Sequence, residues 1–243
     1  MNRGEYLELC RRWLGETLGV EADALHPATL PPRPIENPPA LKRVPREPSP
    51  ALKGYPSAQS SAQSSGPALE ALRQKVKTCQ ACGLAARRKN FVDFGNPAPS
   101  SLLFLTDYPE FYDEVQGRQF AAESGALLDK MLAALGLSRA TIWLSAVIKC
   151  HSTIVPGSDL RPYLVCREHF AAELLLARPR LVVGFGALTY RFLFERDDFA
   201  RIRGKDLEWN GVPMRFTHHP RDLSDDPALK REAWDDLKAL KVQ

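Results

Sequence analysis

The hexapeptide Leu181-Val182-Val183-Gly184-Phe185-Gly186 identifies the fold class of this 243-residue chain. Its apolar residues indicate a buried strand, and its glycines mark the turn at which the chain enters a helix that reaches Phe194. A buried strand followed directly by a helix is typical of a parallel α/β sheet. Because sites in such sheets gather at the carboxyl ends of the strands, this turn also predicts one wall of a binding site.

The same alternation of strand and helix extends in both directions from the hexapeptide. Further strands are predicted at residues 101–105, 141–148 and 212–217, and helices at residues 67–78, 124–135, 162–177 and from 227 onward. This order predicts a three-layer α/β/α domain around a central, mostly parallel four-stranded sheet. The strand ends that would form its site are Thr106-Asp107, Ser145 to Cys150, Gly184 to Gly186, and Thr217 to Pro220.

The chain before this domain has a different composition. Residues 1–20 carry apolar side chains at helical spacing and predict an amphipathic helix, which needs a surface or a protein partner to lie against. Residues 21–66 are rich in Pro, Ser and Ala and predict a disordered, flexible linker. We therefore expect the folded domain at residues 67–243 and an ordinary free thiol at Cys10.

Bulk properties narrow the class of protein. No apolar run is long enough to span a bilayer, and the first residues lack the pattern of a secretory signal. We therefore expect a cytoplasmic monomer with no membrane partner, in which disulfides do not form. A net charge of +4 is compatible with contacts to phosphate groups.

Four cysteines are spaced like the ligands of a metal centre. Cys79 and Cys82 form a C-x-x-C pair with turn-forming neighbours, and Cys150 and Cys166 follow on other elements. A structural zinc more often takes two C-x-x-C pairs, so one pair with two isolated cysteines favours an iron–sulfur cluster. Zinc remains an alternative, as do four free thiols packed as small apolar side chains.

Several motifs, taken in order, resemble the iron–sulfur, family 4 type of the uracil-DNA glycosylase superfamily over nearly all of residues 75–243. They are Cys79 to Leu84, Phe94 to Pro97, Gly117 to Phe120 with Ser124 to Leu132, Lys149-Cys150, Leu181 to Ala187, His219-Pro220, and Trp234 to Leu237. The resemblance implies the glycosylase fold and a 4Fe–4S cluster held by Cys79, Cys82, Cys150 and Cys166. It also implies base-excision repair of single- or double-stranded DNA, in which a damaged base is flipped out and its N-glycosidic bond hydrolysed.

The resemblance assigns roles to individual residues. Phe120 would stack on the extruded base, His219 would hydrogen-bond the base oxygen on which negative charge grows, and Asp107 would position water or the sugar. The base pocket would be bordered by Thr106, Tyr108, Phe120, Ser145 and Ala146. The DNA contacts would be Arg87, Arg88, Lys149 and Arg221, with Leu223 pressing into the duplex.

Two stretches depart from the family pattern. Thr106 to Glu110 stands where the family has G-E-x-P-G, so both glycines are lost and the pocket floor should be reshaped. Ala146 occupies the position of the family asparagine that recognises uracil, and a methyl group can neither donate nor accept a hydrogen bond. We therefore expect a glycosylase with altered specificity. The alternative is a catalytically silent iron–sulfur module that binds DNA or a protein.

Overall fold

A computed structural model describes residues 65–96, 100–151 and 161–240 of the chain. The predicted N-terminal helix and Cys10 lie outside the described residues, and so does the predicted linker apart from its last two positions, Ser65 and Gly66. Helix α2 begins at Ser65, slightly before the predicted domain boundary. None of the helices within the described ranges is long and apolar enough to cross a membrane.

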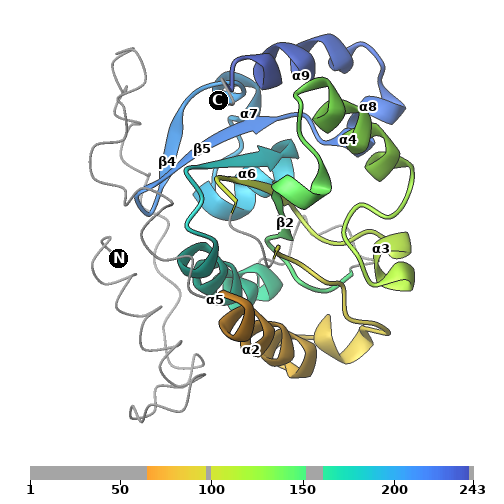
Figure 1. The fold of residues 1–243 in the computed structure, drawn as a ribbon, viewed down its shortest axis with the longest axis vertical. Helices are drawn as coiled ribbons and strands as arrows, with labels where there is room; N and C mark the ends of the chain where they lie inside the picture. The colour runs from red at the N-terminus through yellow and green to blue at the C-terminus, as the bar shows by residue number, and fades with distance from the viewer. Residues whose placement is uncertain (1–64, 97–99, 152–160, 241–243) are drawn as a thin grey trace.

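Five strands form one sheet in the spatial order β2-β1-β3-β5-β4 (Figure 1). They are β1 (Leu102–Thr106), β2 (Trp143–Ala146), β3 (Leu181–Phe185), β4 (Leu207–Trp209) and β5 (Val212–Thr217). All neighbouring pairs are parallel except β4 with β5. The predicted α/β class with a mostly parallel sheet is confirmed, whereas the predicted count of four strands is one too low.

The additional strand, β4, is short and belongs to a hairpin with β5. It has three residues, and the turn that follows is Asn210-Gly211, with φ angles of 51° and 82°. Positive φ at both central residues is the geometry that joins antiparallel strands through a two-residue turn. A strand of this length shows no apolar periodicity, but the Asn-Gly dipeptide is itself a hairpin signal.

Helices cover both faces of the sheet (Figure 1). They are α2 (Ser65–Thr78), α3 (Phe111–Gln116), α4 (Glu123–Ala134), α5 (Arg161–Ala177), α6 (Gly186–Phe194), α7 (Phe199–Ile202), α8 (Pro220–Asp225) and α9 (Leu229–Lys238), with short 3-10 turns η2 (Ala85–Arg87) and η3 (Arg139–Thr141). The long helices lie close to the predicted bounds. Three helices of four to six residues, α3, α7 and α8, were not predicted because they are too short to show helical periodicity.

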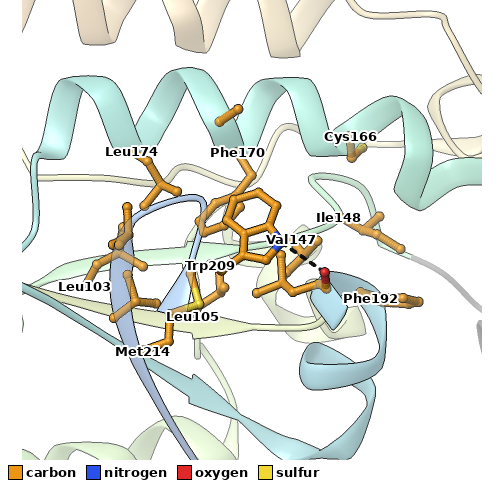
Figure 2. Packing of buried hydrophobic residues seen from close by; sticks show 14 of the residues in the cluster. Leu103, Leu105, Val147, Ile148, Cys166, Phe170, Leu174, Phe192, Trp209 and Met214 are labelled. Atoms are coloured by element: carbon orange, nitrogen blue, oxygen red, sulfur yellow. Dashed lines mark hydrogen bonds between the residues drawn. The ribbon is translucent and has the colours of Figure 1, made fainter. Parts of the chain in front are cut away.

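The core has two parts because the side chains of β1 alternate between the faces of the sheet. Leu103 and Leu105 belong to the larger cluster, which includes residues of α2, α5 and α6. Figure 2 shows Phe170 and Leu174 of α5 pointing into this cluster, with Cys166 one turn before Phe170. The intervening β1 residues pack with α4 and α9 on the other face. The parallel strands end at one edge of the sheet, where Thr106, Asp107 and His219 lie close together.

Candidate active site and metal centre

A chain of hydrogen bonds links the end of β1 to the segment after β5. Nε2 of His219 lies 2.7 Å from Oγ1 of Thr106, and the Thr106 hydroxyl donates to Oδ1 of Asp107 at 3.1 Å. All three side chains are buried. The structure thus brings together the histidine and the carboxylate that the sequence singled out, with Thr106 as a link between them that the sequence did not predict.

The tautomer of His219 follows from its other ring nitrogen. The backbone N–H of Arg221 donates to Nδ1 at 3.0 Å, so the proton of the neutral ring is on Nε2. Burial lowers the pKa of His219 to about 4, although Asp107 acts in the opposite direction. The 3.9 Å separation between Nε2 and Asp107 is therefore not an ion pair at neutral pH. His219 is an uncharged N–H donor held at the end of the sheet.

The strand-to-helix turn after β3 makes room for this histidine. Gly186 begins α6 with a φ of +83°, and a Cβ there would stand 3.1 Å from Cβ of His219. A larger residue would meet both a backbone conformation that side chains disfavour and a crowded contact. The turn predicted as a wall of the site is therefore the surface against which His219 packs.

Phe120 lies beside the ring of His219. The two ring centroids are 5.9 Å apart, with 26° between the ring planes. The φ of Phe120 is +52°, which is uncommon for a residue with a large side chain. Two contacts hold this conformation: Arg139 donates to the Phe120 carbonyl at 2.8 Å, and Gly125 lies so close that a Cβ would stand 1.9 Å from that oxygen. Strain of this kind is frequent in binding sites.

Arg221 contacts the acidic groups of the site, and its side chain is 35% exposed, so the predicted contact with DNA stays a prediction. It donates to Oδ2 of Asp107 at 3.1 Å and lies 3.5 Å from Oε1 of Glu110, with its guanidinium 5.6 Å from the Tyr108 ring centroid. Burial acts to lower the pKa of Arg221, but Asp107, Tyr108 and Glu110 outweigh it and raise the pKa. The side chain therefore joins the segment after β1 to the segment after β5.

The paired residues of β1 and β2 show which side chains face the site. Ala146 is paired with Thr106 and shares its face of the sheet, whereas Ser145 is paired with Leu105 and faces α5. The Ser145 hydroxyl donates to Glu173 of α5 at 2.7 Å. The prediction that Ser145 borders the base pocket is therefore wrong, because neighbouring residues of a strand point to opposite faces.

Lys149 is also directed into the core. It is 1% exposed and pairs with Glu173, which is 0% exposed. Its ammonium donates to Oγ of Ser145 at 2.7 Å and to the Ala146 carbonyl at 2.8 Å, and lies 4.4 Å from the ring centroid of Phe94. The predicted phosphate contact is wrong, because this ammonium is buried and already paired.

Two further predicted DNA contacts have other surroundings. Leu223 is 2% exposed on α8 and does not project from the domain, so the predicted insertion into a duplex is not possible in this conformation. Arg88 lies beside the end of α2, where it donates to the Val76 carbonyl at 2.7 Å. Arg87, in contrast, has an exposed side chain.

The four predicted ligand cysteines are free thiols on three separate segments, and Cys150 and Cys166 are buried. The pKa of Cys150 is raised to about 11, mainly by burial and to a smaller extent by Cys82 and Cys79. The pKa of Cys166 is likewise raised to about 12, mainly by burial and to a smaller extent by Cys150 and Cys82. Within the described ranges, no three or more His, Cys, Asp or Glu side chains are arranged to hold a single metal ion.

The surroundings of these thiols suit thiolate ligands. Arg88 Nη1 lies 3.5 Å from Sγ of Cys150 and acts to lower the pKa of that thiol. A backbone hydrogen bond from Lys149, together with its charge, does the same for Cys166. Because a metal centre replaces the thiol protons, nearby cations and N–H donors favour its formation. The donor set is therefore compatible with a thiolate-bound cluster larger than one ion.

Fold and site together define an α/β/α protein with a polar site at the carboxyl ends of its parallel strands. Residues 92–238 match the sequence profile of the Uracil DNA glycosylase superfamily. This match covers more than half of the chain, and the protein belongs to that superfamily.

Several curated relatives carry the name type-4 uracil-DNA glycosylase, and three of them show the extent of the similarity. The protein of Saccharolobus solfataricus is 23% identical over 183 residues, which cover 71% of this chain and 85% of the relative. The protein of Archaeoglobus fulgidus is 26% identical over 184 residues, covering 71% and 92%. The protein of Thermotoga maritima is 24% identical over 180 residues, covering 71% and 93%. The resemblance seen in the motifs is thereby confirmed.

Proposed function

We propose that this protein is a DNA-base glycosylase that flips uracil or another deaminated base out of DNA and hydrolyses its N-glycosidic bond. Membership of the superfamily and the names of the three relatives support this reaction class. The observation that carries the proposal is the buried, neutral His219, whose Nε2–H lies among Thr106, Asp107 and Phe120.

A neutral imidazole suits the departure of a base as an anion. When the glycosidic bond breaks, negative charge grows on a carbonyl oxygen of the base, and a fixed N–H donor stabilises it. Because His219 is uncharged, the site holds this donor without the cost of burying a cation. Donation from Nε2 to Thr106 keeps the ring oriented, and a base oxygen would replace or share that acceptor.

Asp107 has the acceptor capacity to hold a water molecule. Its Oδ1 accepts from the Thr106 hydroxyl and from the backbone N–H of Tyr108, and its Oδ2 accepts from Arg221. A carboxylate oxygen has two lone pairs, so Oδ2 retains one for the attacking water or for the sugar. Phe120 would provide the flat apolar face for the extruded base.

At Ala146 this site differs from one that recognises uracil. It shares the Thr106 face of the sheet, where an asparagine would have supplied both a donor and an acceptor. Each missing hydrogen bond costs about 1–3 kcal/mol if the partner on the base is left unsatisfied. We therefore propose a specificity shifted from uracil toward a base that makes fewer polar contacts at this position.

We further propose that Cys79, Cys82, Cys150 and Cys166 hold a 4Fe–4S cluster. When bound, the cluster would supply structure rather than chemistry, because hydrolysis of the glycosidic bond involves no electron transfer. It would join the loop after α2 to the end of β2 and to α5. Cys150 follows Lys149, whose ammonium holds the Ala146 carbonyl, so the cluster would stabilise this wall of the base pocket.

The test is a base-release assay on single- and double-stranded oligonucleotides that carry a panel of deaminated bases. The full-length protein should release at least one of them, and His219→Ala should reduce that release strongly. The absence of release from every substrate, with the metal centre intact, would contradict the glycosylase. That result would instead support the silent DNA- or protein-binding module, which is favoured by Ala146 and by the three donors that already bind Asp107.

A further inference from the structure

Helix α3 presents an apolar face to solvent beside the proposed active site. Phe111, Tyr112 and Val115 are 51%, 56% and 56% exposed. The helix follows the segment after β1 that carries Asp107, and it lies on the side of the domain toward which the parallel strands point (Figure 1). Within the described ranges, the other exposed large apolar side chain is Leu164 of α5, at 46%.

The acidic groups of α3 are turned inward. Asp113 accepts from the backbone N–H of Glu110 at 3.0 Å and from that of Ala121 at 2.6 Å. Glu114 accepts from the backbone N–H of Lys89 at 2.9 Å. Both carboxylates are buried. Because they are used in these internal hydrogen bonds, the solvent-facing side of α3 is free of the charges that would repel phosphate.

Exposed cations flank this apolar face. The hydrogen bond from Lys89 to Glu114 holds the segment with Arg87 and Lys89 beside α3, and Arg118 follows the helix directly. All three cationic side chains are exposed. The Arg118 guanidinium donates to the neutral amide of Gln116 at 2.9 Å, and no ion pair joins these three cations to a carboxylate in the described part of the chain.

We infer that this face binds unpaired nucleobases next to the base that enters the active site. Phe111 and Tyr112 would be the stacking surface, and Arg87, Lys89 and Arg118 would contact the adjacent phosphates. The inference rests on the proposed function in taking DNA as the ligand. Exposed aromatic rings flanked by cations suit the binding of single-stranded nucleic acid. Each base has a flat face that can stack on a ring, and each phosphate carries a negative charge.

The burial of Leu223 adds to the argument. A glycosylase must compensate for the unstacking of the neighbours of a flipped base, and an apolar side chain commonly does so. Leu223 is 2% exposed and is not available for this contact. The exposed rings of α3 follow the segment that carries Asp107, and Glu110, the residue before the helix, lies 3.5 Å from Arg221 of the site, so the helix adjoins the proposed active site.

Binding of the full chain to a fluorescently labelled single-stranded oligonucleotide with one deoxyuridine tests the inference. Phe111→Leu and Tyr112→Leu keep apolar area but remove the flat ring, and each should weaken binding about 5- to 150-fold, the range of base–aromatic stacking. Leu164→Ser, at a comparably exposed apolar position, should leave affinity unchanged. Arg87→Ala, Lys89→Ala and Arg118→Ala should each reduce the slope of log affinity against log salt by about 0.7. The ring variants should leave that slope unchanged.

Wild-type affinity in both ring variants, with unchanged circular dichroism, would overturn the inference, as would an equal loss in Leu164→Ser. The same preparations are assayed for base release. Ring-dependent binding without any release would contradict the glycosylase while supporting the role of α3. Normal release with ring-independent binding would contradict the role of α3 while supporting the glycosylase.

Discussion

Thr106 and His219 are joined by a 2.7 Å hydrogen bond although 113 positions separate them in the chain. His219 must donate in this bond, since its Nδ1 already accepts from the backbone of Arg221. The Thr106 hydroxyl can then donate only onward, to Asp107. One directed chain of hydrogen bonds therefore connects the two side chains proposed for the reaction.

Removing the link should slow base release without abolishing it. Thr106→Val keeps the shape of the side chain but leaves His219 Nε2–H and Asp107 without this partner. We expect the single-turnover rate to fall about tenfold, which corresponds to one buried hydrogen bond. His219→Ala removes the donor itself and should cost about 10²- to 10³-fold.

Thr106→Ser, which retains the hydroxyl, is the matched control and should remain close to wild type. Because Thr106 acts through His219, adding Thr106→Val to His219→Ala should produce little further loss. Fully additive losses in the double variant would show that Thr106 acts by another route.

Restoring an amide on β2 should restore uracil recognition. Ala146→Asn provides a donor and an acceptor on the Thr106 face of the sheet, and uracil release should rise relative to the other bases of the panel. The larger side chain enters a fully buried position, so stability should fall by about 1–3 kcal/mol. Ala146→Leu is the control: it adds comparable volume without polar groups and should not increase uracil release.

The metal centre can be tested through its ligands. After anaerobic purification, we expect a coloured protein that contains iron, and Cys150→Ser or Cys166→Ser should reduce both iron content and visible absorption. Cys10→Ser, outside the proposed ligand set, should change neither. A colourless protein with one bound zinc would contradict the cluster and support the zinc alternative.

The buried pair of Lys149 and Glu173 should matter strongly for stability. Glu173→Gln leaves the Lys149 ammonium buried without its carboxylate, and we expect the free energy of unfolding to fall by about 3–5 kcal/mol in urea titrations. Asp197→Asn, which disrupts an exposed pair with Arg191, should change it by less than about 0.5 kcal/mol. Equal effects of the two substitutions would show that burial adds nothing to the Lys149 pair.

The depressed pKa of His219 predicts a loss of stability in acid. The unfolded chain protonates this histidine near its ordinary pKa of 6.5, whereas the folded chain does so only near 4. Between these values the unfolded state binds more protons, so stability is full above pH 6.5 and declines as the pH falls. From pH 7 to pH 5 this one group should cost about 2 kcal/mol. His219→Gln should lose that much less over the same interval.

Most of the fold and the family resemblance could be predicted from apolar periodicity and residue spacing in the sequence. The run at residues 181–186 predicts a buried strand and a turn into a helix, because a short apolar run that ends in glycines is typical of a strand covered on both faces. The spacing of Cys79, Cys82, Cys150 and Cys166 predicts a metal centre, and this remains a prediction, since no three such side chains in the described part of the chain are arranged around one ion. These features are local patterns, or depend only on the order of elements along the chain.

The orientation of polar side chains could not be obtained in this way. From the sequence, Lys149 is predicted to be a surface cation, whereas the structure pairs it with the buried Glu173 of α5. Ser145 is predicted to border the base pocket, whereas its pairing with Leu105 shows that it lies on the other face of the sheet. Leu223 is predicted to insert into a duplex, but the packing of α8 against the domain buries it. The partners of these side chains lie on other elements, so their environment exists only once the chain has folded and paired its strands in one register.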